Sequence, residues 1–162
     1  MAERVFTQTF GVVSALIEKD GKILLVKESK SGADNGKWNH PGGWIEVGEN
    51  PIEGVKREVE EETGFQFTPT SVLGVYSLFR KDLLETEKKT PHPIKIIFLG
   101  NLSSDKVREL EDDVSETKWF SSEEIEKMDI STLRDVDIKK MIKDYFAGKR
   151  YPLELLTHTV SE

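Results

Sequence analysis

Residues 43–65 read GWIEVGENPIEGVKREVEEETGF, and this stretch decides the fold because it specifies one short helix from end to end. Asn50 is a good N-cap, and Pro51 suits the first helical position, where a backbone N–H is not needed. Glu53, three residues after Asn50, completes a pattern that resembles a capping box. Gly64 tolerates the left-handed conformation in which helices commonly end. An apolar stripe at helical spacing would pack against a core, and it consists of Ile52, Val55 and Val59.

The same helix carries glutamates at i, i+3 and i+4, namely Glu58, Glu61 and Glu62, so their side chains share one face. Like charges at this spacing destabilise a helix by roughly 0.2–0.5 kcal/mol per pair, and negative charge in the last turns opposes the helix dipole by about 0.3–1 kcal/mol. A hard cation would relieve this repulsion, because carboxylate oxygens are preferred ligands of Mg²⁺. The pattern therefore predicts a Mg²⁺ site, with Mn²⁺ as an alternative cation. A solvated acidic helix face is the ordinary alternative.

The stretch also matches the motif G-x5-E-x7-R-E-U-x-E-E-x-G-U, in which U is apolar, at every fixed position. The matching residues are Gly43, Glu49, Arg57, Glu58, Val59, Glu61, Glu62, Gly64 and Phe65. This pattern resembles the Nudix box of the MutT-like Nudix hydrolase superfamily. A chance match at all of these positions is very improbable, which counts against the solvated face. The resemblance implies an α/β fold, an α/β/α sandwich built on a mixed β-sheet with helices on both of its faces.

The resemblance also implies roles for individual residues of this box. It implies that the three glutamates of the acidic face ligate the metal, and that the backbone carbonyl near Gly42 adds a further ligand. The Gly42-Gly43 pair suits such a close backbone approach, because neither residue has a Cβ atom. Arg57 and Glu49 are implied to pair with each other and to brace the preceding loop against the helix. Together with Glu58, they form the catalytic part of the box.

A second acidic segment lies further along the chain. Residues 112–119, DDVSETKW, resemble the segment that many Nudix enzymes place opposite the box helix. In that pattern, an acid six residues before the tryptophan acts as a general base or as a further metal ligand. Asp113 holds this position here, although glutamate is commoner there, and Glu116 is the competing candidate. Two solvated acids at the start of a strand are the ordinary alternative for both residues.

Substrate contacts are less specified than the metal site. Trp38 and Phe79 are candidates to stack on a heterocycle, although such aromatic residues more often belong to a core. Lys95 is a candidate to reach a phosphate group from a strand, although scattered basic residues usually lie on the surface. These three residues form the predicted substrate-binding set.

Two further segments carry a narrower resemblance. Residues 38–43, WNHPGG, and residues 148–154, GKRYPLE, resemble a bacterial group of Nudix phosphatases that act on nucleoside tri- and diphosphates and on thiamine-type pyrophosphates. The chain departs from that group at Gly42, where alanine is usual, and at Lys95, where arginine is usual. These departures leave open the natural substrate and whether orthophosphate or pyrophosphate is released.

Composition limits the classes of protein. The chain has 162 residues, 36% of them hydrophobic and 33% charged, which suits one Nudix-type domain over residues 1–162. A net charge of −7 opposes binding to a nucleic acid polymer, but metal ions can let an acidic protein bind a small phosphorylated substrate. The longest apolar run, 12–17, is far shorter than the roughly 20 residues of a membrane span. With no cysteine and no secretory pattern in its first residues, the chain is expected to be a cytoplasmic monomer or homodimer.

The rest of the chain predicts strands and two more helices. Asp20-Gly21 between two β-rich runs predicts a tight hairpin, and Ser121 with Glu124 predicts a capped short helix that ends near residue 128. Periodicity predicts strands at 10–18, 22–28, 71–80, 94–102 and 114–120, a helix at 135–147, and a charged connection at 81–93. These elements suit one α/β sandwich.

The leading interpretation is a Mg²⁺-dependent Nudix hydrolase that cleaves a phosphoanhydride bond in a nucleoside di- or triphosphate or a related small pyrophosphate. Divalent ions assist such a reaction because they screen phosphate charge and lower the pKa of a bound water. The alternative is a Nudix-fold module that senses a nucleotide without hydrolysing it, which would not need the full set of glutamates. A diphosphate isomerase is a third interpretation, but the chain lacks the cysteine of its usual chemistry.

Overall fold

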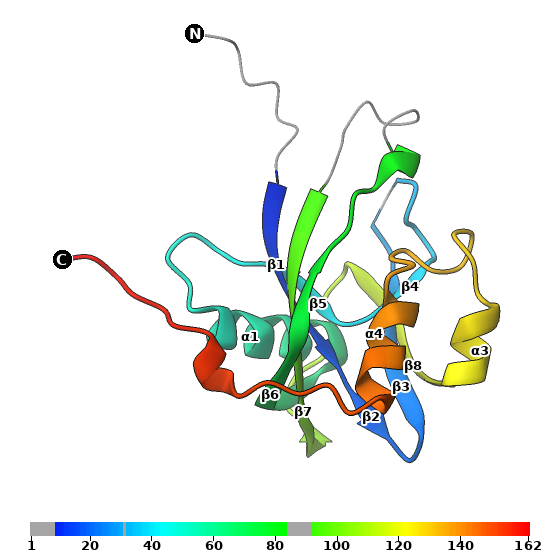
Figure 1. The fold of residues 1–162 in the computed structure, drawn as a ribbon. Coiled ribbons are helices and arrows are strands. Elements are labelled where there is room, and N and C mark those ends of the chain that lie inside the picture. The colour runs from blue at the N-terminus through cyan, green and yellow to red at the C-terminus, as the bar shows by residue number, and fades with distance from the viewer. Residues whose placement is uncertain (1–8, 31, 84–91) are drawn as a thin grey trace, which may run out of the picture.

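The computed structural model describes residues 9–30, 32–83 and 92–162, which form two sheets with helices packed around them (Figure 1). The first sheet has the strand order β5-β1-β7-β6, and in the second sheet β3 pairs with β2, β4 and β8. The elements are β1 (Thr9–Leu16), β2 (Glu18–Lys19), β3 (Lys22–Glu28), β4 (Trp38–Asn39), β5 (Gly42–Trp44), α1 (Pro51–Thr63), β6 (Phe65–Ser77), β7 (His92–Lys106), β8 (Val114–Ser121), α3 (Ser122–Lys127), α4 (Ile138–Phe146) and the 3-10 helix η1 (Leu153–Leu155).

The first sheet is mixed, as predicted. β1 runs parallel to β7, whereas β5 and β6 run antiparallel to their neighbours. Alternate residues of its strands face two separate hydrophobic clusters. Val13, Ala15 and Ile17 pack with α1 on one face, and Leu16 packs with α3 and α4 on the other. The α/β/α sandwich is therefore confirmed, and none of its helices within the described residues is long and apolar enough to cross a membrane.

Helix α1 begins and ends at the predicted residues. The Asn50 side chain accepts a hydrogen bond from the backbone N–H of Ile52 at 3.0 Å, and Gly64 ends the helix with φ of 78°. Glu53 does not complete the expected capping box: its carboxylate accepts a hydrogen bond from Lys56 at 2.8 Å instead. The cap is therefore a single side chain, Asn50, assisted by Pro51 in the first turn.

Two strands are longer than predicted. β6 begins at Phe65, directly after the glycine that ends α1, rather than at residue 71, and β7 extends to Lys106 rather than to 102. The added residues pair with each other, and the pairing register shifts between Pro69 and Ser71. Pro69 in β6 and the run 103–106, SSDK, in β7 disfavour a strand, so the local pattern did not predict this half of the hairpin, which pairing between the two strands stabilises.

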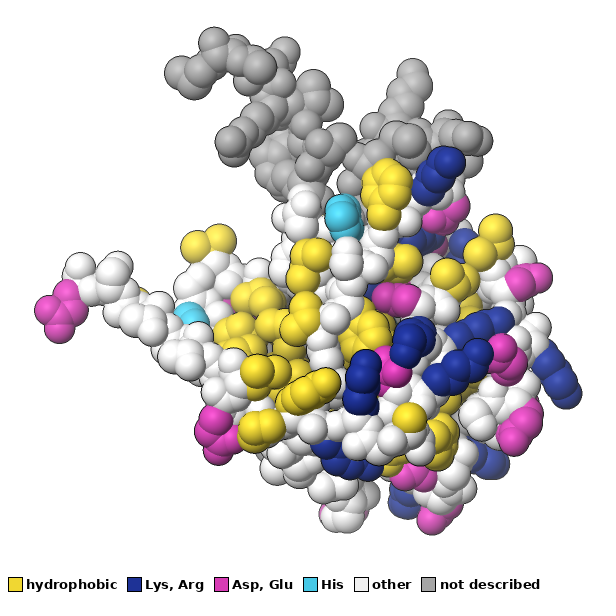
Figure 2. All heavy atoms as spheres, viewed as in Figure 1, with side chains coloured by type: hydrophobic (Ala, Val, Ile, Leu, Met, Phe, Trp, Pro, Cys, Tyr) yellow, Lys and Arg dark blue, Asp and Glu magenta, His cyan; other side chains and the backbone are white. Residues whose placement is uncertain are grey.

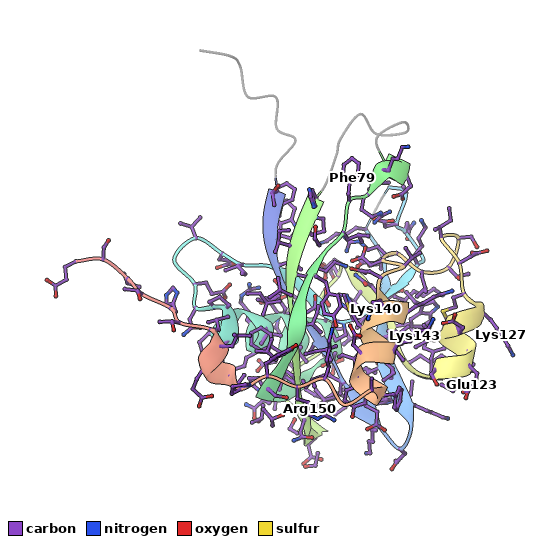
Figure 3. All side chains as sticks on the ribbon, in the orientation of Figure 1. Phe79, Glu123, Lys127, Lys140, Lys143 and Arg150 are labelled. Carbon is purple, nitrogen blue, oxygen red and sulfur yellow. The ribbon has the colours of Figure 1, made fainter. Side chains whose placement is uncertain are left out.

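The other predicted elements differ little from the structure. Asp20 and Gly21 form the expected hairpin turn with φ of 52° and 78°, and Ser121 forms a full capping box with Glu124. Helix α4 begins at Ile138, three residues after the predicted start, because the backbone N–H groups of Ile138 and Lys139 bond to carbonyls three residues back rather than four. Most of the predicted connection at 81–93 lies outside the described residues. On the outer face of α4, Lys140 pairs with Asp144 and Lys143 lies 3.7 Å from Glu126, so basic and acidic side chains mix there (Figures 2 and 3).

The segment after α4 crosses the edge of the first sheet. The backbone of Tyr151 makes two hydrogen bonds of 2.8 Å with the backbone of Val72 on β6. Leu153 and Leu156 then pack against the hydrophobic cluster beneath α1, and the C-terminus projects beyond that helix (Figure 1). This tail therefore ties α4 to β6 and α1.

Candidate active site

A cavity of about 600 Å³ opens where β1, β5 and α1 meet the segments that follow β3 and precede β8. One group of lining residues, here called the acidic cluster, consists of Glu58, Glu61, Glu62 and Asp113. A second group, here called the ion-pair network, surrounds the basic side chains Arg80, Lys95 and Arg134. The cavity thus brings together residues from distant parts of the chain.

The carboxylates of α1 are crowded and partly removed from water. Burial raises the pKa of Glu58 and of Glu61, and it raises the pKa of Glu62 well above its usual value. Glu62 is only 7% exposed, and one of its oxygens accepts a hydrogen bond of 2.9 Å from the backbone N–H of Gly42. Burial and mutual repulsion therefore both disfavour the ionised form of these side chains.

The two glycines before the box allow β5 to lie directly against these carboxylates. A Cβ atom at Gly43 would lie 2.4 Å from Oε2 of Glu58, and one at Gly42 would lie 2.3 Å from the carbonyl oxygen of Val13. Alanine, usual at the position of Gly42 in the narrower group, would therefore clash in this backbone arrangement. The oxygen-rich donor set of three carboxylates beside close backbone fits a hard divalent cation such as Mg²⁺.

Arg57 connects the loop between β5 and α1 to the acidic cluster. Its guanidinium donates two hydrogen bonds to the carboxylate of Glu49, of 2.8 and 3.0 Å, and one of 3.2 Å to the backbone oxygen of Trp44. The expected Arg57–Glu49 pair is therefore present, and these bonds lower the pKa of Glu49. Arg57 also donates hydrogen bonds to Glu58 at 2.8 Å and to Glu61 at 3.1 Å. Its guanidinium therefore contacts two members of the acidic cluster directly.

Asp113 and Glu116 face different surroundings. Asp113 lines the cavity, where one oxygen lies 2.6 Å from Nζ of Lys30 and the other is buried without a hydrogen-bond partner among the described residues. Glu116 is exposed on β8 and lies 3.7 Å from Lys27, outside the cavity lining. Of the two candidates, the structure brings only Asp113 to the acidic cluster. The backbone N–H of Ser29 holds this segment in place by donating to the carbonyl of Asp113 at 2.9 Å.

The predicted phosphate contact, Lys95, is fully buried in the ion-pair network. Its ammonium donates to Asp135 at 2.7 Å and to Asp137 at 2.9 Å. Burial would raise the pKa of Asp135, but Lys95 and Arg134 outweigh it and hold this pKa at about 2. The side chain of Asp137, the residue before α4, binds Lys95 and makes no capping bond to the helix. Lys95 lines the cavity, but its charge is already paired.

His40 lies beside this network. Both of its ring nitrogens are buried without a hydrogen-bond partner in the part of the chain that the structure describes, and burial lowers the pKa of His40 to about 3. One ligand atom each from His40, Asp135 and Asp137 lie within 4.8 Å of one another, which is a possible metal grouping. Lys95 already supplies a positive charge to both of these carboxylates, so this grouping suits a further cation less well than the carboxylates of α1 do.

The aromatic residues on the cavity wall are not the two that the sequence predicted. Trp38 packs edge-on against Phe120 in the core, with ring centroids 4.8 Å apart, and Phe79 is half exposed outside the lining (Figure 3). Phe10 and Trp44 line the cavity instead, with stacked rings 4.4 Å apart. In the sequence, the position of Trp44 directly after the Gly-Gly pair is the signal that could have predicted its place on the cavity wall.

The chain is similar to proteins of one known family. Residues 6–143 match the family model described as the NUDIX domain. The chain is 34% identical over 146 residues to a Methanocaldococcus jannaschii protein named ADP-ribose pyrophosphatase, across 90% of this chain and 78% of that relative. It is 31% identical over 145 residues to phosphatase NudJ of Escherichia coli K12, across 89% of this chain and 88% of that relative.

One solved structure is similar to this chain over almost its whole length. A Nudix hydrolase from Nitrosomonas europaea matches with a TM-score of 0.82 at 35% identity, across 94% of this chain and 98% of that one. The family match includes the whole box, residues 43–65, and the residues that line the acidic cluster. The chain therefore belongs to the Nudix family of hydrolases.

Proposed function

We propose that this Nudix hydrolase uses Mg²⁺ to cleave a phosphoanhydride bond in a nucleoside di- or triphosphate or a related small pyrophosphate. The observation that carries the proposal is the close approach of Gly42 and Gly43 to the buried carboxylates of α1. The names of two relatives, an ADP-ribose pyrophosphatase and the phosphatase NudJ, support the same reaction class. Mn²⁺ is the expected substitute cation, since it also accepts carboxylate and carbonyl oxygens.

Glu58, Glu61 and Glu62, with the backbone carbonyl of Gly42, would hold the cation. When bound there, a divalent ion screens the charge of the phosphates and lowers the pKa of a water molecule. Glu49 and Arg57 keep the box loop and α1 at a fixed separation through their paired hydrogen bonds. Arg57 can also balance the charge of the acids that it touches.

Asp113 is the proposed proton acceptor for the attacking water. Its unpartnered oxygen is buried at the cavity, and its other oxygen is held by Lys30. A general base must lie within reach of the proton that it takes, and of the two acidic candidates only Asp113 lines the cavity. Lys30 would orient this carboxylate.

A substrate panel tests the proposal. Nucleoside di- and triphosphates, ADP-ribose and thiamine pyrophosphate would be incubated with Mg²⁺ while orthophosphate and pyrophosphate are measured separately. A matched pair of variants assigns the activity to the site: Glu61→Gln removes a cavity carboxylate, and Glu60→Gln alters the adjacent glutamate outside the cavity lining. We expect Glu60→Gln to retain activity and Glu61→Gln to lose it. Absence of hydrolysis with either Mg²⁺ or Mn²⁺, or equal activity of the two variants, would contradict the proposal.

A further inference from the structure

Two aromatic rings form an exposed wall of the cavity. Phe10 on β1 and Trp44 on β5 stack with centroids 4.4 Å apart and an interplanar angle of 17°. Trp44 remains 60% exposed although tryptophan is among the costliest side chains to leave in water, and both residues line the cavity. The stack therefore presents one flat, apolar surface to whatever enters the cavity.

The strands hold this wall at a defined distance from the acidic cluster. Trp44 pairs with Val12 in the β1–β5 register, and Ser14 pairs with Gly42, so the ring is held on a strand rather than on a loop. Trp44 directly follows Gly43, where an added Cβ atom would lie only 2.4 Å from Oε2 of Glu58. The backbone oxygen of Trp44 also accepts the hydrogen bond from Arg57. The Trp44 ring is therefore attached to strand β5, the same strand whose glycines lie beside the acidic cluster.

Among the described residues of the cavity lining, Phe10 and Trp44 are the only phenylalanine, tyrosine or tryptophan side chains. Lys95 and Arg80 are buried, and each is held by at least two carboxylates of the ion-pair network. Trp38, the aromatic residue before the Gly-Gly pair, faces the core rather than the cavity. A planar ring that enters the cavity therefore finds its aromatic partner at Trp44.

We propose that Trp44, whose ring is stacked on Phe10, is a specificity-determining residue that stacks on the heteroaromatic ring of the substrate's organic half. The ligand class is a nucleobase or a comparable nitrogen heterocycle joined to a di- or triphosphate. The proposal rests on the proposed function for the position of the phosphates at the acidic cluster. Stacking of a base on an aromatic side chain contributes enough binding energy to change affinity by roughly tenfold or more.

Steady-state kinetics on two substrates test the stacking role. The first is a nucleoside triphosphate, and the second is phosphoribosyl pyrophosphate, whose organic half has no aromatic ring. We expect Trp44→Leu to raise KM for the nucleotide by roughly tenfold, with a much smaller change in kcat and in KM for the ringless substrate. Phe79→Leu is the matched control, because it removes a half-exposed aromatic ring outside the cavity lining, and it should leave both substrates unaffected.

Tryptophan fluorescence tests binding without catalysis. A non-hydrolysable nucleoside triphosphate analogue should quench the emission of the wild-type protein and of Phe79→Leu, and should not quench Trp44→Leu. The same quenching in a protein that hydrolyses no pyrophosphate would overturn the proposed function and support the stacking role. Normal hydrolysis with equal effects of Trp44→Leu on both substrates, or quenching retained in Trp44→Leu, would overturn the stacking role alone.

Discussion

At the scale of single residues, Glu62 lies buried at the cavity wall although removing a carboxylate from water is costly. One hydrogen bond from Gly42 offsets part of this cost, and the neighbouring acids add to it. The folded-state pKa of Glu62 therefore lies well above the value of 4.5 that an unperturbed glutamate has. The site keeps a carboxylate where the fold alone would favour a neutral side chain, which is the arrangement expected of a metal ligand.

Glu62→Gln should reduce turnover by orders of magnitude and stabilise the metal-free protein. A raised folded-state pKa means that ionisation of Glu62 costs stability as pH rises above 4.5, so the gain should appear near neutral pH and fade below pH 4.5. Relief of like-charge repulsion alone contributes about 0.2–0.5 kcal/mol. Urea unfolding in a chelator, at pH 7 and pH 4, measures the effect. A less stable variant at pH 7 would contradict this account of the burial cost.

Asp113→Asn and Glu116→Gln should differ sharply in activity. Loss of a general base typically lowers kcat by about 10²–10⁴-fold, whereas Glu116 makes one exposed ion pair outside the cavity lining. We therefore expect a large loss for Asp113→Asn and a change of at most about twofold for Glu116→Gln. The measurement is kcat at saturating Mg²⁺. Equal and mild effects would return both acids to the role of solvated surface residues.

At the scale of elements, α1 carries both the three glutamates of the acidic cluster and the residues that cap the helix. The three glutamates can share a face because α-helical geometry brings i, i+3 and i+4 together, and Val55 and Val59 anchor the neighbouring face in the core. Strand β5 then lies against the acidic face, and Arg57 joins the loop between β5 and α1 to both. One helix and one short strand therefore supply the glutamates of the acidic cluster and the backbone beside them, and the segment before β8 adds Asp113.

Asn50→Ala should destabilise the protein by about 1 kcal/mol, because the Asn50 side chain satisfies a backbone N–H in the first turn of α1. Glu53→Ala is the matched variant one turn away. Since Glu53 bonds to the exposed Lys56 rather than to the cap, its loss should cost at most about 0.5 kcal/mol. Urea unfolding of both variants separates the two roles. Similar losses would show that Glu53 caps the helix after all.

At the scale of the whole molecule, the ion-pair network joins segments that lie far apart in the chain. Arg80 contacts Asp34 and Asp135, and Lys95 on β7 contacts the segment before α4. Arg134 contacts Glu28 at the end of β3. These bonds hold the cavity walls against one another, so the network is structural as well as part of the cavity lining.

Lys95→Met should destabilise the fold by about 3–5 kcal/mol, because it leaves Asp135 and Asp137 buried without their counter-ion. A residue that only binds phosphate would instead raise KM and leave the unfolding midpoint unchanged. Urea unfolding together with KM for a nucleotide distinguishes the two roles. Lys95→Arg, which keeps the charge, should recover part of the lost stability.

Deletion of residues 149–162 should lower stability without changing the ranking of substrates. The tail contributes two backbone hydrogen bonds to β6 and the packing of Leu153 and Leu156, together worth about 2–4 kcal/mol, and none of its residues lines the cavity. Leu153→Ala with Leu156→Ala tests the packing in the full-length chain and should reproduce part of the loss. A changed order of rates between nucleotide and thiamine-type substrates would indicate that the tail contacts the substrate.

The sequence by itself determined the box helix, its N-cap and the shared face of Glu58, Glu61 and Glu62, because these depend on residues within one or two helical turns. The mixed sheet also followed from the sequence through the family resemblance. Only the tertiary structure decided which residues face the cavity. Asp113 lines the cavity and Glu116 does not, and the aromatic rings on the wall are Phe10 and Trp44 rather than Trp38 and Phe79. Lys95 is paired with two aspartates. The physical reason is that these choices depend on contacts between segments distant in sequence, which no local pattern specifies.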